Sequence, residues 1–154
     1  MEGMANFAPL FGAGGLVMAF FIYLYILSLP DGNEKMRDIA GQIHQGAMVY
    51  LRRQNSILVF FIAAIAILLW AFLGLPTAIA YLFGGISSML AGFFGMKGAT
   101  KANVRCAEAA RRYKPAVVRA LSAAFLGGTI MGLSVASLGL IGVGTLFIFY
   151  GDPA

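Results

Sequence analysis

The sequence predicts an all-α membrane protein with four transmembrane helices. Of its 154 residues, 60% are apolar, aromatic or cysteine and only 11% are charged, whereas a soluble domain carries about 25% charged residues. Four long apolar runs alternate with polar segments, and the lysines and arginines collect in two of those segments. So little charge cannot cover a water-facing surface, and one cysteine cannot form an internal disulfide. The composition therefore excludes a soluble enzyme, a secreted disulfide scaffold and a disordered tail.

The first apolar run covers residues 8–29 and contains no charge. As a helix it would be roughly 33 Å long, enough to cross a hydrocarbon core of about 30 Å. Pro9 suits a helix start, and the segment from Pro30 to Gly32 is a strong stop signal. The residues before the run include Glu2 and no basic residue, so we expect a retained span and not a signal peptide.

Three further apolar runs follow. Residues 57–73 and 77–96 are joined by the short connection Gly74-Leu75-Pro76, and Trp70 near the end of the first of them suits a membrane interface. The last run, residues 116–150, exceeds the thickness of a bilayer and must protrude, tilt or break at its glycines.

The two polar stretches, residues 31–56 and 97–115, are predicted to be helical extensions of the spans. Apolar residues recur every three or four positions from Met36 to Leu51, and either Asp31 or Asn33 would cap that helix. The second stretch is rich in alanine and ends at Pro115.

The charge distribution predicts the orientation in the membrane. All 11 lysines and arginines lie in the two polar stretches or just beyond them, and none lies near either chain end. The positive-inside rule then places both stretches in the cytoplasm and both termini on the outer side of the cell (inner) membrane. The same distribution explains the net charge of +5 without a nucleic-acid partner.

Small residues repeat every four positions in the last two apolar runs, which predicts close helix packing. The positions expected to pack are Gly84, Ser88, Gly92, Gly95, Gly128 and Gly132. Residues 57–73 contain no glycine, so this helix is expected to face lipid as an outer wall.

Groups that carry chemistry are scarce. The interiors of the four runs contain no Asp, Glu, Lys or His, so no proton relay or ion site is predicted at depth. Lys97, Lys101 and Arg105 recur every four residues and would form a basic stripe, for which lipid headgroups are favoured over an anionic substrate. Glu108 is expected to pair with Arg105 or Arg112. No catalytic, cofactor-binding or metal-binding residue is predicted, and His44 and Cys106 are expected to be structural.

Two segments resemble the membrane-bound, ion-translocating inorganic pyrophosphatases. The first carries the pattern Ile43-x-x-Gly46-Ala47-x-x-Tyr50-Leu51-x-Arg53-Gln54. The second, residues 92–105, carries Gly92, Gly95-Met96, Ala99-Thr100 and Ala102-Asn103-x-Arg105.

This resemblance implies a much longer homodimeric pump that hydrolyses pyrophosphate with magnesium and moves protons or sodium ions. The aspartate-rich catalytic motifs of that family have no match here. The chain therefore resembles the N-terminal segment alone, an outer-wall scaffold that holds no cofactor itself and is inactive by itself. Its implied partners are the lipid bilayer and the remaining helices of the pump.

Two alternatives stay open at this point. The chain would also suit an independent small four-helix membrane protein with a structural or partner-binding role. A small ion-conducting subunit is disfavoured because the spans lack a carboxylate. Proton or sodium specificity and any need for potassium are left open.

Overall fold

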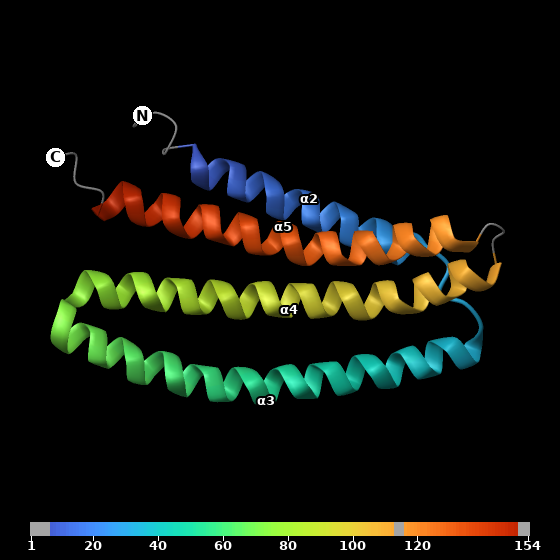
Figure 1. The fold of residues 1–154 in the computed structure, drawn as a ribbon, viewed down its shortest axis with the longest axis horizontal. Coiled ribbons are helices and arrows are strands. Elements are labelled where there is room, and N and C mark those ends of the chain that lie inside the picture. The colour runs from blue at the N-terminus through green and yellow to red at the C-terminus, as the bar shows by residue number, and fades with distance from the viewer. Residues whose placement is uncertain (1–6, 113–115, 151–154) are drawn as a thin grey trace.

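The computed structural model describes residues 7–112 and 116–150, and it is all-helical over these residues (Figure 1). The helices are α2 (Ala8–Ser28), α3 (Glu34–Leu73), α4 (Leu75–Arg112) and α5 (Ala116–Tyr150). All four are long and apolar enough to cross a membrane. The predicted all-α class and the four helices able to span a membrane are thus confirmed.

Helix α3 runs without interruption from the first polar stretch into the apolar one, and α4 runs from an apolar half into a polar one. The side chain of Asn33 accepts a hydrogen bond from the backbone N–H of Met36 at 2.9 Å, so Asn33 and not Asp31 caps α3. Gly74 ends α3 with φ +93°, a conformation that favours glycine, and the chain turns back directly into α4.

The core lies between α2, α4 and α5. Ile26, Ala102 and Ile130 form its buried cluster, one residue from each of these helices. Helix α3 packs chiefly along α4, and of its forty residues only Leu51 and Ala66 are buried. The bundle is therefore a three-helix unit with a fourth helix along one side (Figure 1).

Helix α2 is displaced along the long axis of the bundle, away from the turn that joins α3 and α4 (Figure 1). Its first residues, Ala8 and Pro9, lie against Gly144 of α5, and its last turn is hydrogen-bonded to Arg105 of α4. The apolar α2 therefore lies beside the second half of α4, the half that carries the basic residues.

Candidate functional site

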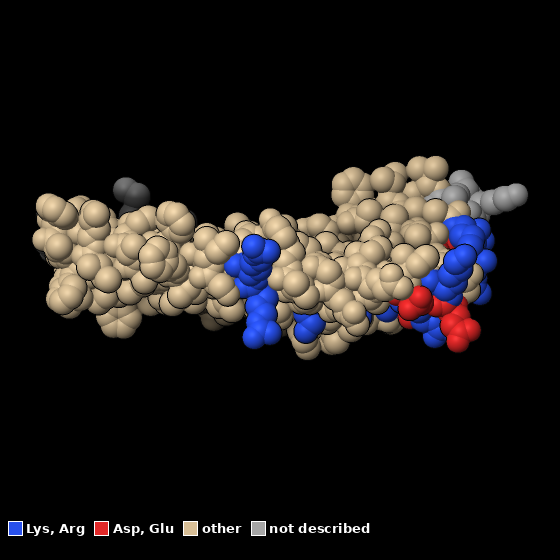
Figure 2. All heavy atoms as spheres, turned by 90° about the horizontal axis from the view of Figure 1, so that it is seen from below, with Lys and Arg blue, Asp and Glu red and all other residues tan. Residues whose placement is uncertain are grey.

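Charged side chains occupy one half of the elongated bundle. Figure 2 shows a face on which one half carries no charge and the other carries the lysines, arginines and acidic residues. The uncharged half is formed around the α3–α4 turn, and the charged half contains the polar ends of both helices. This segregation gives the bundle two chemically different ends.

The predicted basic stripe is not a continuous exposed surface. Lys97 is exposed and Lys101 is half-buried, but Arg105 is only 8% exposed. The three residues recur on one face of α4, but the end of α2 lies over Arg105 and buries it.

Arg105 joins α4 to the end of α2. Its Nη1 donates to the carbonyl of Lys101 at 2.8 Å, and its Nη2 donates to the carbonyl of Leu27 at 3.2 Å. Leu27 lies in the last turn of α2, where backbone carbonyls have no partner within the helix and the helix dipole is negative. A guanidinium from another helix thus satisfies the end of α2.

Glu108 is buried one turn further along α4 and is 4% exposed. Its two carboxylate oxygens accept hydrogen bonds from Arg111 Nε and Nη2 at 2.8 and 3.0 Å. These bonds lower the pKa of Glu108; burial opposes that effect, and the charges of Arg111 and Arg112 add to it. The same pair raises the pKa of Arg111. Glu108 was expected to pair with Arg105 or Arg112, but its hydrogen-bonded partner in the structure is Arg111.

Lys97 lies beside the apolar middle of α2. It lines a hollow of ≈270 Å³ together with Leu16, Phe20 and Tyr23, and its Nζ is 5.8 Å from the ring centre of Phe93. Sequence reasoning placed Lys97 outside the apolar runs and missed this position. No signal in the sequence predicts the position of Lys97 beside α2, because that position depends on the displacement of α2 along α4.

Only part of the predicted small-residue set packs within this bundle. A Cβ added at Gly95 would lie 2.6 Å from the side chain of Met131, so this glycine does permit close approach. A Cβ added at Gly84, Gly92, Gly128 or Gly132 would lie within 4 Å of no other part of the described chain, the backbone of its own helix turn aside. Ser88 is exposed. At these five positions the predicted helix packing stays a prediction.

The contacts are instead made by neighbouring residues. A Cβ at Gly127 would lie 2.6 Å from that of Ala102, and one at Gly98 would lie 2.9 Å from Ile130. On α2, Gly12 and Gly15 lie against Ser137 of α5. The packing face of α5 is thus displaced by one residue from the predicted one.

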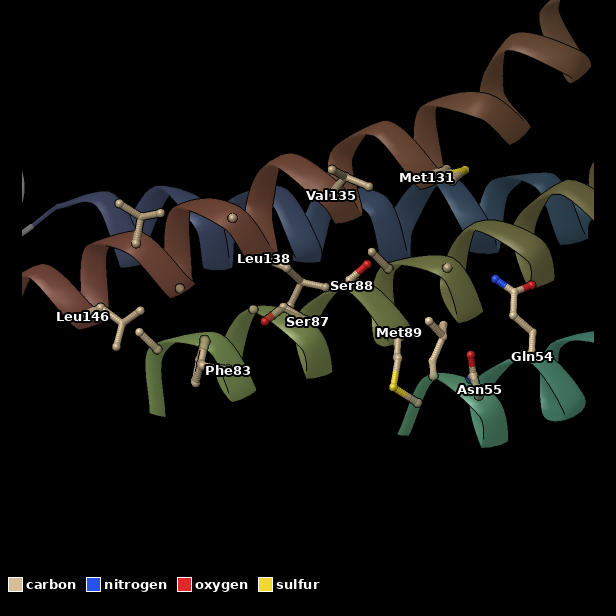
Figure 3. Close-up of a pocket in the computed structure, with 18 of the residues that line it drawn as sticks. Gln54, Asn55, Phe83, Ser87, Ser88, Met89, Met131, Val135, Leu138 and Leu146 are labelled. Carbon is tan, nitrogen blue, oxygen red and sulfur yellow. The ribbon is translucent and has the colours of Figure 1, made fainter. Parts of the chain in front are cut away.

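Three of the predicted packing positions, Gly84, Ser88 and Gly92, border a groove of ≈540 Å³ between α3, α4 and α5 (Figure 3). Its polar lining includes Gln54 and Asn55 of α3 and the serines Ser87 and Ser88 of α4. The rest of its surface is largely glycine and aliphatic side chains, which suits an apolar occupant with some hydrogen-bonding capacity.

His44 connects the polar halves of α3 and α4. Its Nδ1 lies 2.8 Å from Thr100 Oγ1, and the threonine hydroxyl itself donates to the carbonyls of Met96 and Lys97. One hydroxyl proton cannot serve all three neighbours at once; when it points to a carbonyl, the hydroxyl oxygen can accept from Nδ1–H of His44.

The described residues include no group of three His, Cys, Asp or Glu side chains that could hold a metal ion. Asp38 accepts a hydrogen bond from Gln42, and Asp31 lies 4.0 Å from Arg37. These residues therefore do not fit the magnesium that the family resemblance implies, and we derive no catalytic step from them.

Several curated ion pumps are similar to most of this chain. A protein of Clostridium tetani assigned as a K+-stimulated pyrophosphate-energised sodium pump is 43% identical over 133 residues, which is 86% of this chain and 19% of that protein. A K+-insensitive pyrophosphate-energised proton pump of Methanosarcina mazei is 39% identical over 154 residues, or 99% of this chain and 22% of the pump. The K+-stimulated sodium pump of Thermotoga maritima is 40% identical over 126 residues, or 82% and 17%.

The chain thus spans about a fifth of the length of these curated relatives. Residues 13–154 also match the model of the inorganic H+ pyrophosphatase family. With this match over nearly the entire chain, and with four apolar helices of spanning length, the chain belongs to the family of membrane-bound, pyrophosphate-energised ion pumps.

Proposed function

We propose that these four helices form an N-terminal wall of a pyrophosphate-energised ion pump and that the catalytic centre lies outside them. The observation that carries this proposal is the similarity of nearly the whole chain to about a fifth of several such pumps. The sparse carboxylates support it, because hydrolysis of a phosphoanhydride with a metal needs side chains that hold the metal and activate water.

The wall role follows from the faces that the four helices leave uncovered. Gly84 and Gly92 line the groove between α3, α4 and α5, and Gly128 lines a second hollow between α4 and α5. A Cβ added at any of these glycines, or at Gly132, would have open space. Small residues on an apolar helix permit close approach of another helix in lipid. The proposed occupants are the remaining helices of the pump. The homodimer implied by the family belongs to this proposal as well.

The orientation is a second part of the proposal. From the positive-inside rule we propose that the charged half lies in the cytoplasm and that both chain ends lie on the outer side of the cell membrane. In a Cys106→Ser background, Leu75→Cys at the exposed α3–α4 turn should react with an impermeant maleimide added outside intact cells. Lys35→Cys should react only after permeabilisation. The reverse pattern would contradict this orientation.

Chimeric pumps test the function. This chain replaces the aligned segment of the Thermotoga maritima pump in one chimera and of the Methanosarcina mazei pump in another. Each chimera should release phosphate from magnesium pyrophosphate and should retain the transported ion and potassium response of its longer part. The chain alone, reconstituted in liposomes, should release no phosphate above an empty-liposome control.

As a control, each chimera also carries Gly127→Leu. This change disrupts the contact with Ala102 inside the bundle, so the chimeric pump should fail to assemble. Correctly folded but inactive chimeras would refute the wall role, and magnesium-dependent turnover by the chain alone would refute the absence of a catalytic centre.

A further inference from the structure

The end of α2 meets α4 and α5 around a hollow of ≈210 Å³ in the charged half of the bundle. Tyr25 and Pro30 contribute to its wall from the α2 side, Arg105 and Glu108 from α4, and Arg119 from α5. Residues from three helices therefore converge on one space that includes two guanidinium groups.

Arg105 is the unusual member of this lining. A guanidinium has five N–H donors, and the two hydrogen bonds that Arg105 makes both end on backbone carbonyls. Its Nε is buried without a partner, and no carboxylate of the described residues lies within ion-pair distance of it. A buried cation without a counter-charge is costly, so this position favours an anion.

Glu108 does not supply that counter-charge. Both of its oxygens are held by Arg111 through a bidentate pair, which neutralises the one acidic group in the wall of the hollow. Arg119 adds a second positive charge from α5. The charged residues that line the hollow are thus two arginines and one glutamate, and the carboxylate of that glutamate is bound by Arg111.

We infer that this hollow binds a phosphate-bearing anion through Arg105 and Arg119. Guanidinium groups recognise phosphate oxygens through paired charge-assisted hydrogen bonds, and the volume is sufficient for one phosphate group. Two sources share this chemistry. An anionic phospholipid would place its headgroup where the apolar α2 ends beside Tyr25, as expected at a membrane interface. Free inorganic phosphate would enter from water.

The test uses the whole chain purified in a neutral detergent, with thermal stability measured during titration. One series adds phosphatidylglycerol and is compared with phosphatidylcholine. The other adds inorganic phosphate and is compared with sodium chloride at equal ionic strength. A saturable rise in Tm with phosphatidylglycerol alone identifies a lipid headgroup, a rise with phosphate alone identifies the free anion, and a rise with both identifies a general phosphate site. Each of these three results supports the inference.

The variants separate this site from general basicity. Arg119→Gln should weaken the apparent affinity about tenfold or more, the change expected on losing one charge-assisted hydrogen bond. Arg53→Gln makes the same charge change at an exposed residue away from the hollow and should have no effect. Ala109→Leu fills the hollow without altering charge and should also abolish the response.

Arg105→Lys keeps the charge but removes the guanidinium fork, and it should weaken binding with less risk to folding than Arg105→Gln, since Arg105 also holds the end of α2. The inference is overturned if none of the added anions gives a saturable rise, or if Arg53→Gln reduces the response as much as Arg119→Gln and Ala109→Leu do.

Discussion

Helix α3 and the unit formed by α2, α4 and α5 use two different kinds of contact. In the three-helix unit, the contacts of Gly12 and Gly127 involve groups that cannot move aside alone: the carbonyl oxygen of Ser137 and the Cβ of Ala102. Other glycines of this unit, Gly95 and Gly98, lie against the longer side chains of Met131 and Ile130. Against α3, Gly85 of α4 meets only the branched end of Ile62. The first kind brings helix backbones together, whereas the second rests on a side chain that can change its rotamer.

This difference decides how each region responds to added bulk. A backbone carbonyl or a β-carbon cannot move aside without displacing a whole helix, so overpacking there is expensive. A long aliphatic side chain can adjust locally. The comparison indicates that the contacts at Gly12 and Gly127 tolerate added bulk less well than the contact between Gly85 and α3.

The largest effect is expected at Gly127. Gly127→Leu forces α5 away from Ala102 of α4 and should destabilise the bundle by about 3 kcal/mol, the upper part of the usual overpacking range. The adjacent Gly128→Leu has open space and is the matched control. The measurement is the fraction of monodisperse protein left after heating in detergent. Similar losses for both variants would show that the packing face of α5 is not the one described.

A smaller effect is expected where α2 meets α5. Gly15→Leu collides with the Ser137 side chain, which can rotate in part, so we expect a loss of about 1–3 kcal/mol. Gly14→Leu changes the neighbouring residue, which has nothing within 4 Å, and should be close to neutral. The same heating assay distinguishes them, and a greater loss for Gly14→Leu would place α2 in a different rotation.

The α3 contact should tolerate substitution better. In Gly85→Ala the added methyl meets Ile62, 2.8 Å away before adjustment, but alanine also favours a helix over glycine by about 1 kcal/mol. The net change should therefore stay below about 1 kcal/mol. Gly84→Ala, in open space, should be neutral or stabilising. A loss at Gly85→Ala as large as at Gly127→Leu would remove the distinction between the two regions.

The smallest effect concerns Glu108, which lies where the two regions join: a Cβ on Gly32, just before α3, would be 3.1 Å from its carboxylate. Because the pKa of Glu108 is lowered in the folded protein, its contribution to stability is present above the ordinary pKa of a glutamate. That contribution is lost as the pH falls through the lowered pKa. Solvent reaches the exposed partner Arg111 and limits the size of the effect.

Glu108→Gln should therefore lower Tm at pH 7 and should bring variant and parent closer together as the solution is acidified. Tm is recorded for both proteins from pH 7 downwards, with exposed Glu34→Gln as the control. A difference that does not shrink in acid would show that the carboxylate charge is not what stabilises this end of α4.

Several features could be predicted from the sequence alone because they depend on local chemistry. Uninterrupted apolar runs, the stop around Pro30 and a capping residue at either Asp31 or Asn33 indicate where helices begin and end, whatever packs around them. The separation of a charge-free half from a basic half is likewise a property of the chain order. The patterns at residues 43–54 and 92–105 were sufficient to indicate the family that the comparisons show.

The packing of the four helices selects which face of each helix is used and how far each helix is displaced along its neighbour. Gly127 and Gly128 both belong to runs of small residues, and they differ only by a rotation of about 100° about the helix axis. No local property chooses between them, because the choice depends on the summed contacts with α4. In the same way, Lys97 and Arg105 belong to one series that recurs every four residues on α4. Arg105 is nevertheless buried under the end of α2, whereas Lys97 is exposed. Helix periodicity defines the possible contacts, and the position of the partner helix selects among them.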